Sequence, residues 1–86
     1  MKYQAHYSAN GGKSKLETPL EGNNLSKLER EIVMLAESKR KQGCACVWDV
    51  YEGDTCVALG GTDKNGRRWR VDESDIHLIV SEKQNH

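Results

Sequence analysis

The chain has 86 residues, of which 36% are hydrophobic, and it contains no Phe. A chain of this length forms one domain with a thin core and has little room for a deep catalytic cleft. Its 13 basic residues balance its 13 acidic residues, which argues against a protein that binds nucleic acid by net charge alone. We expect a single domain over residues 1–80 and a frayed tail over 81–86, where there is nothing to bury.

The sequence also predicts a cellular location. No apolar segment typical of a signal peptide follows Met1, and no apolar run approaches the ~20 residues that span a membrane. The three cysteines are an odd number. These features predict a reduced, cytoplasmic protein with free thiols and no membrane contact.

Residues 3–20 are typical of a β-hairpin. Apolar and polar side chains alternate over residues 3–8, as in a strand with one buried face. The Asn-Gly-Gly sequence at residues 10–12 tolerates the positive φ angles that a tight turn requires. Alternation resumes over residues 16–20, which predicts the returning strand there. Pro19 should make that strand short or place it at a sheet edge, because proline cannot donate to a ladder.

The next element is an amphipathic helix within residues 24–43. Asn24 or Ser26 can cap its start, and Ser26 with Glu29 has the spacing of a capping box. Gly43 offers a left-handed stop at its end. Apolar residues recur along one face at helical spacing: Leu25, Leu28, Ile32, Leu35 and Ala36.

After Gly43 the hydrophobic period changes from helical spacing to two. Strands are predicted at residues 44–51, 55–60 and 67–71, with one more at 75–80. Turns are predicted at residues 52–54 and over residues 60–66, where Gly60 and Gly61 precede an Asn-Gly pair. The order β-β-α-β-β-β predicts an α+β fold: an antiparallel sheet of four to six strands with one helix packed on one face.

No set of side chains in the sequence matches a catalytic motif. Cys44 and Cys46 would share one face of a strand, beside Cys56 on the next, and His6 or His77 could complete a zinc site. Structural zinc sites usually take their cysteines from a C-x₂₋₄-C turn, which this chain lacks, and buried cysteines commonly serve as small hydrophobes. We therefore expect core cysteines, no metal, no cofactor and no enzymatic activity.

Two basic clusters are the candidate binding residues. Basic residues concentrate in segments 25–43 and 63–70, whereas acidic residues dominate segments 44–62 and 71–86. Alternation in the last basic segment puts Arg68 and Arg70 on one strand face and Trp69 on the other. We predict that Trp69 packs on the helix, and that the arginines form either a solvated face or a contact surface for carboxylate or phosphate.

The candidate residues are Lys64, Arg67, Arg68 and Arg70 in the first cluster, and Lys39, Arg40 and Lys41 in the second. The second cluster also suits the negative end of a helix, so helix-end electrostatics is its alternative explanation. If the fold brings both clusters to one side, they would form one positive region on an otherwise neutral protein.

Three segments carry a resemblance to a known family. The helix "NNLSKLEREIVMLA", the strand "CACVWDVYEG" and the closing "NGRRWRVDE" are similar in order and pattern to small phage and mobile-element proteins. The chain most resembles, over residues 16–73, the β-α-β-β anti-CRISPR proteins that act on type I-F surveillance complexes. This resemblance implies a non-enzymatic inhibitor that occupies a nucleic-acid-binding surface, with weight on Lys39, Arg40, Arg68 and Arg70. The additional N-terminal hairpin and the acidic segment 71–82 depart from that pattern.

The sequence thus predicts a small non-enzymatic protein that acts through protein–protein contacts. Its partner would be a protein, with a nucleic-acid-binding complex as the kind that the resemblance suggests. The alternative is a small nucleic-acid-binding domain that uses both basic clusters. Pairing through an exposed strand edge would make a homodimer, although Pro19 discourages open-ended association.

Overall fold

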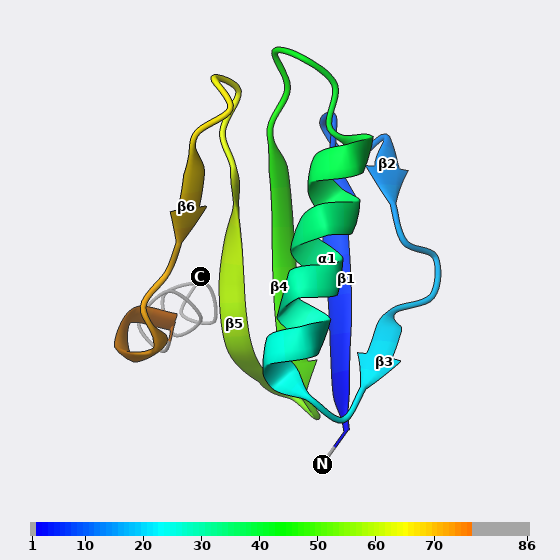
Figure 1. Cartoon of the computed structure of the whole chain (residues 1–86), viewed down its shortest axis with the longest axis vertical. Helices are drawn as coiled ribbons and strands as arrows, with labels where there is room; N and C mark the ends of the chain where they lie inside the picture. Colours follow the sequence, from blue (N-terminus) through cyan, green and yellow to red (C-terminus); the bar gives the residue numbers. More distant parts are fainter. Residues whose placement is uncertain (1, 77–86) are drawn as a thin grey trace, which may run out of the picture.

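The computed structural model describes residues 2–76 and has an α+β fold. One helix packs across one face of a six-stranded antiparallel sheet, as the sequence predicted (Figure 1). The strand order is β2-β1-β4-β5-β6, and β3 also pairs with β1. The elements are β1 (Tyr3–Ala9), β2 (Ser14–Lys15), β3 (Leu20–Gly22), α1 (Leu25–Lys39), β4 (Cys46–Glu52), β5 (Thr55–Thr62) and β6 (Arg68–Arg70).

The core lies between α1 and the two central strands β1 and β4. Alternate residues of each strand point to the helix, so small side chains such as Ala5 leave room for the helix to approach the sheet. The helix contributes Leu28, Ile32 and Ala36 to this core, at the spacing predicted for its apolar face. The largest fully buried side chains are Leu28, Ile32, Val50 and Cys46.

The returning part of the N-terminal hairpin is short, as Pro19 predicted, but the strand predicted at residues 16–20 is misplaced. The returning chain forms two short strands, β2 and β3, both paired with β1. They are separated by residues 16–19, which have no strand structure. Asn10, Gly11 and Gly12 all have positive φ angles in the turn between β1 and β2, as predicted.

The two ends of α1 differ in how well the sequence located them. Asn24 is the N-cap: its side-chain oxygen accepts a hydrogen bond from the Lys27 backbone N–H at 3.1 Å. Ser26 therefore lies within the helix. The prediction that Gly43 ends the helix is wrong, because the helix ends at Lys39 and Arg40 is extended. Gly43 instead has its positive φ in a turn closed by the Cys44 N–H and the Lys41 carbonyl.

The prediction that Gly60 and Gly61 form a turn is also wrong, because both lie within β5. A Cβ on Gly60 would be 2.6 Å from Cζ2 of Trp48, and one on Gly61 would be 2.9 Å from Cζ2 of Trp69. The two glycines are therefore needed where tryptophan rings lie close against the strand. The reversal itself occurs afterwards, at residues 63–66, where Gly66 has a φ of 85°.

After β6, residues 75 and 76 do not begin the strand predicted over residues 75–80, because they belong to a helical turn. Residues 73–76 form a helical turn in which the Ile76 N–H bonds to the Asp72 carbonyl. Ile76 is buried, so this turn packs against the rest of the protein. Residues 77–80 and the predicted tail at 81–86 lie outside the described residues. Among residues 2–76, no helix has the length and apolar character needed to cross a membrane.

Candidate binding surface

Three chain reversals meet at one end of the sheet. The pairing register aligns the end of β1, the start of β4 and the end of β5 in one row: Ala9 opposite Cys46, and Cys46 opposite Thr62. The β1–β2 turn, the α1–β4 connection and the β5–β6 turn therefore all leave the sheet at the same end, together with the last turn of α1 (Figure 1). This register brings the two basic clusters of the sequence together.

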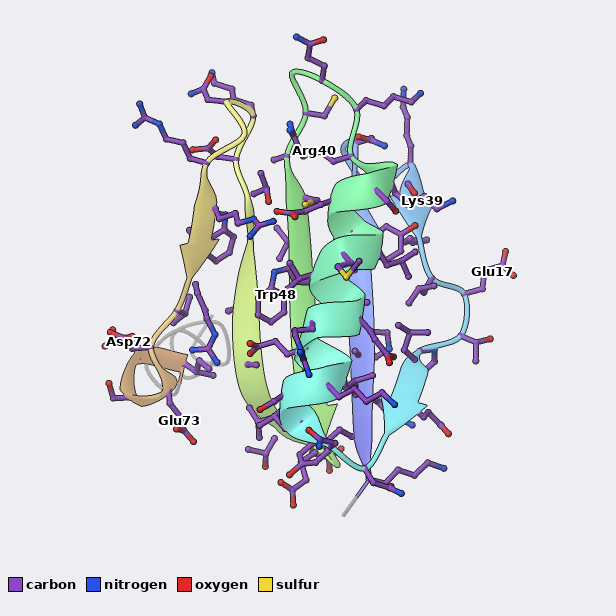
Figure 2. All side chains as sticks on the ribbon, viewed as in Figure 1. Glu17, Lys39, Arg40, Trp48, Asp72 and Glu73 are labelled. Carbon is purple, nitrogen blue, oxygen red and sulfur yellow. The ribbon has the colours of Figure 1, made fainter. Side chains whose placement is uncertain are left out.

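Specific contacts hold these reversals against one another. The Asn10 side chain accepts a hydrogen bond from the Lys41 backbone N–H at 2.8 Å and donates one to the Lys39 carbonyl at 2.9 Å. Arg40 donates to the Cys44 carbonyl at 2.9 Å. Its Nη2 also lies 3.6 Å from where a Cβ on Gly66 would stand, so Arg40 reaches the β5–β6 turn (Figure 2).

We call this surface the basic end. It consists of Lys13, Lys39, Arg40, Lys41, Lys64 and Arg67. All are exposed except Arg40, which is partly buried. Residues 10–13, 39–45 and 63–67 contain one acidic side chain, Asp63. Its carboxylate accepts hydrogen bonds from the backbone N–H groups of Arg67 and Asn65, and these bonds, that from Arg67 first, lower the Asp63 pKa.

Lys13 is the residue of the basic end that the sequence did not indicate. It follows the Asn-Gly-Gly turn and has no basic neighbour on that turn. The signal available was the antiparallel order itself. If β1 pairs with the strand after the helix, then the turn that follows β1 lies beside the helix C-terminus.

Arg68 and Arg70 are directed elsewhere, because both side chains reach back to α1. Arg68 forms a bidentate pair with Glu37, with Nε and Nη2 at 2.7 Å and 2.6 Å from the two carboxylate oxygens. Arg70 contacts Glu29 at 2.8 Å through Nη2. The hydrogen bonds from Arg68 lower the Glu37 pKa, and the Thr62 hydroxyl adds a further bond to the same carboxylate.

The predicted position of Trp69 on the helix is therefore wrong. Alternation correctly separated Trp69 from Arg68 and Arg70, but the arginines face the helix and Trp69 faces the other side. The register places Trp69 opposite Gly61, where the absence of a Cβ leaves space for the indole. Trp69 remains 40% exposed. Hydrophobicity favoured the Trp69 face, but the groups that α1 presents to this strand are the carboxylates of Glu29 and Glu37, whose position beside β6 depends on tertiary packing.

The opposite end of the sheet is acidic. Glu52 ends β4 and Asp54 lies in the β4–β5 turn, and Asp72 with Glu73 follow β6 toward the same end (Figure 2). There Lys2 forms a 2.9 Å ion pair with Glu21, which lowers the Glu21 pKa. The neutral total charge therefore conceals a separation of charge along the sheet.

The cysteines do not come together. Cys46 is buried on the helix side of β4, whereas Cys56 pairs with Tyr51 beyond a bulge in β5, and Cys44 precedes β4. Burial raises the Cys56 pKa, which keeps that thiol in its unreactive protonated form. Within residues 2–76, no three side chains of the metal-ligating types are grouped. His77, the other proposed zinc ligand, lies outside this range.

On the sheet face away from α1, His6 and Asp49 form a histidine–carboxylate pair, an arrangement that can serve in acid–base catalysis. His6 Nδ1 is 3.6 Å from an Asp49 carboxylate oxygen, and Tyr51 lies edge-on to the imidazole ring. Burial is the main cause that raises the Tyr51 pKa, and the nearby Asp49 and Cys56 raise it further. These shifts hold the tyrosine and the cysteine protonated, so neither one supplies an activated nucleophile beside His6.

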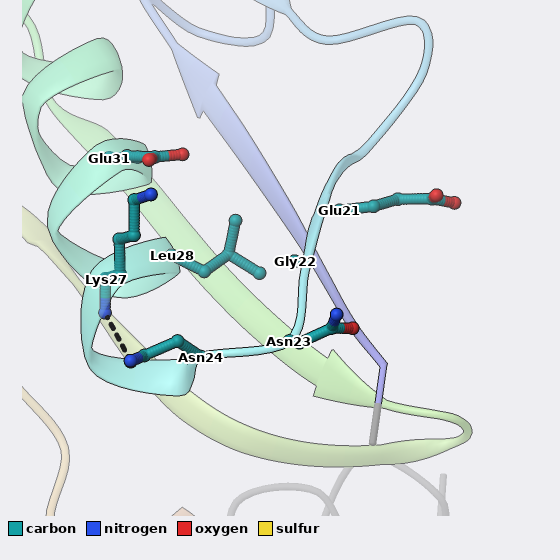
Figure 3. Close-up of a pocket in the computed structure, with 7 residues that line it drawn as sticks. All are labelled: Glu21, Gly22, Asn23, Asn24, Lys27, Leu28 and Glu31. Atoms are coloured by element: carbon teal, nitrogen blue, oxygen red, sulfur yellow. Dashed lines mark hydrogen bonds between the residues drawn. The ribbon is translucent and has the colours of Figure 1, made fainter.

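A hollow of about 290 Å³ lies where the chain enters α1 (Figure 3). Its lining includes Lys27 and Glu31 on the helix, and Glu21 on the preceding segment. Asn24 caps the helix there, so its side-chain oxygen already has a partner. The mixed charges of this lining favour no single kind of ligand.

Comparison with known proteins adds no functional assignment. No protein family, curated protein or solved structure matches the chain. The function must therefore be argued from the surface of the protein itself.

Proposed function

We propose that this protein is a non-enzymatic binding protein whose basic end docks on an acidic surface of a protein partner. The observation that supports the proposal is the meeting of three chain reversals with the end of α1, which together carry six basic side chains and one carboxylate. Turns at the end of a rigid sheet are a common location for binding residues, because the sheet holds them in place.

The anchoring of the basic end favours recognition by shape as well as by charge. Asn10 links the β1–β2 turn to the end of α1, and Arg40 links that end to the β5–β6 turn. The exposed lysines thus project from backbone that is already ordered, so binding requires less loss of conformational entropy. Complementary charge on a partner would raise the association rate and restrict the choice of partner.

The resemblance to anti-CRISPR proteins suggests a setting for this function. We propose a phage or mobile-element accessory protein that acts in the cytoplasm as an inhibitor of a nucleic-acid-binding complex. The order of helix and hairpin supports this part of the proposal. Of the residues that the resemblance emphasises, Lys39 and Arg40 lie at the basic end, whereas Arg68 and Arg70 are paired with helix carboxylates.

Direct nucleic-acid binding at the same end is the second candidate. It is favoured by the density of lysine and arginine there, since such groups neutralise phosphates. The two candidates differ in their expected salt response. Binding to a duplex loses affinity steeply with salt, with a slope of about −0.9 in log–log form for each phosphate contacted.

The experiment is an affinity pull-down from bacterial lysate, with and without nuclease. The test variant is Lys41→Glu/Lys64→Glu, which reverses two exposed charges of the basic end. The matched control is Lys27→Glu/Arg30→Glu, which makes the same charge change on the exposed side of α1. Arg68 and Arg70 are unsuitable targets, because their replacement would break ion pairs within the protein.

The proposal predicts a defined protein complex that survives nuclease, is retained by the control variant and is lost from the test variant. Recovery of nucleic acid alone, with a steep salt response, would establish the second candidate instead. Equal recovery by the native protein and the Lys41→Glu/Lys64→Glu variant would show that the basic end is only a solvated surface.

A further inference from the structure

A groove of about 270 Å³ separates α1 from β6 on the helix side of the sheet. It exists because α1 lies over β1 and β4, while β6 is two strands away from β4. Val33, which is partly buried, and the small exposed edge of Trp48, which is 5% exposed, form the apolar floor of the groove. The missing side chain of Gly60 lets the Trp48 indole lie against β5 (Figure 2). None of the six residues of the basic end lines this groove.

The walls of the groove carry opposite charges. On the helix side, Glu29 and Glu37 stand two turns apart with Val33 between them, because residues at i, i+4 and i+8 share one helix face. On the strand side, Arg68 and Arg70 occupy the same face of β6. The groove is therefore acidic along α1, basic along β6 and apolar between them.

The two Arg–Glu pairs are not equally complete. Arg68 and Glu37 use both carboxylate oxygens, and Thr62 adds a third hydrogen bond. In contrast, Arg70 directs both Nε and Nη2 to one oxygen of Glu29, Oε1, at 3.3 Å and 2.8 Å. Among the described residues, Glu29 Oε2 and Arg70 Nη1 have no hydrogen-bond partner. One acceptor on Glu29 and one donor on Arg70 thus remain without a partner among the described residues at the Glu29 end of the groove.

We propose that this groove binds a free α-amino acid with a flat apolar side chain. The ammonium group would bind Glu29 Oε2, the carboxylate would bind Arg70 Nη1, and the side chain would lie over Val33 and the exposed edge of Trp48. An α-amino acid carries its two charges one carbon apart, so its head group matches one acid–base pair better than a lone cation or anion does. The groove is slightly smaller than the range of about 300–1,000 Å³ typical of drug-sized ligands, which suits a molecule of this size.

The test uses L-phenylalanine and follows the backbone and tryptophan indole N–H signals of the full chain by NMR. We expect saturable shifts of the Trp48 indole signal, with a dissociation constant at or below about 10 mM for so small a ligand. L-phenylalaninamide lacks the carboxylate, and N-acetyl-L-phenylalanine lacks the ammonium group. Each should bind about tenfold more weakly, because each leaves one charged group of the pair without its partner.

Two variants and a control connect the binding to these residues. Glu29→Gln should weaken L-phenylalanine about tenfold and remove its advantage over the N-acetyl analogue. Arg70→Gln should remove its advantage over the amide. Arg30→Gln, one residue from Glu29 and outside the groove, should change neither value. An unchanged pattern of dispersed signals shows that each variant is folded.

Absence of shifts at the Trp48 indole, equal binding of the three probes, or unchanged affinity in both variants would overturn the proposal. The basic end is not involved, so the pull-down and this titration can fail independently.

Discussion

Replacement of Gly60 by alanine tests the close packing of Trp48 against β5. The added Cβ would stand 2.6 Å from Cζ2 of Trp48 and 2.7 Å from the Trp69 carbonyl oxygen. Trp48 is 5% exposed and belongs to the core, so its indole cannot move aside without disturbing its neighbours. Overfilling a packed core costs about 1–3 kcal/mol. The φ angle of Gly60 is not positive, so alanine can adopt it. Alanine also lowers the conformational entropy of the unfolded chain, and this effect offsets about 0.4–1 kcal/mol of the packing cost.

We therefore expect Gly60→Ala to lower the free energy of unfolding by about 1.3 kcal/mol, the difference between the midpoints of these two ranges, about 2 and about 0.7 kcal/mol. For a domain of this size, each kcal/mol corresponds to a fall of about 4–8 °C in the melting temperature. Urea unfolding followed by tryptophan fluorescence and by far-UV circular dichroism measures the change. Coincident transitions by the two probes would confirm that a two-state treatment applies.

Gly22→Ala is the matched control, because it adds the same methyl group in another strand of the sheet. Its Cβ would meet Leu28 Cδ1 at 3.7 Å, an ordinary contact distance. We expect this variant to be as stable as the native protein, or more stable by up to about 1 kcal/mol. If the two variants unfold at the same urea concentration, Trp48 does not pack against Gly60 in the way described.

Two further predictions concern the helix and its partner strand. Asn24→Ala should lower the free energy of unfolding by about 0.5–2 kcal/mol, because it leaves the Lys27 N–H without its cap, whereas Asn23→Ala should have no measurable effect in the same urea unfolding assay. Arg68 lowers the Glu37 pKa in the folded protein, so this pair stabilises the fold above the usual carboxyl pKa of about 4.5 and less as the pH falls below it. In the Arg68→Gln variant, the free energy of unfolding should therefore fall less between about pH 5 and pH 3 than it does in the native protein. Urea unfolding at several pH values measures this, and an equal fall in both proteins would contradict the assignment.

Much of the fold could be predicted from the sequence because its signals are local. The helix has an apolar face and a capping asparagine, the Asn-Gly-Gly and Asn-Gly pairs form turns, and Pro19 accompanies short edge strands. These features depend on residues within a few positions of one another. The errors arose where a local signal had two explanations. The sequence predicts a turn at Gly60 and Gly61, although glycine in a strand can equally leave space for a ring from a neighbouring strand.

In the candidate site, too, local features could be predicted and long-range ones could not. The sequence indicated Lys39, Arg40 and Lys41, together with Lys64 and Arg67, as two clusters, but it contained no information on the distance between them. Their meeting depends on the register of β1, β4 and β5, which is set by long-range pairing. The same register added Lys13 to the surface, through a turn that is 26 residues from Lys39 along the chain (39 − 13).

The sequence by itself determined the order of the elements, the apolar face of the helix, most of the turns and the separation of Arg68 and Arg70 from Trp69. Only the tertiary structure decided which of those two faces packs on α1, and it placed the arginines against Glu37 and Glu29. The physical reason is that alternation divides a strand into two faces without ranking them. The ranking depends on the partners across the sheet and on the helix, which here provide two carboxylates on one side and the space over Gly61 on the other.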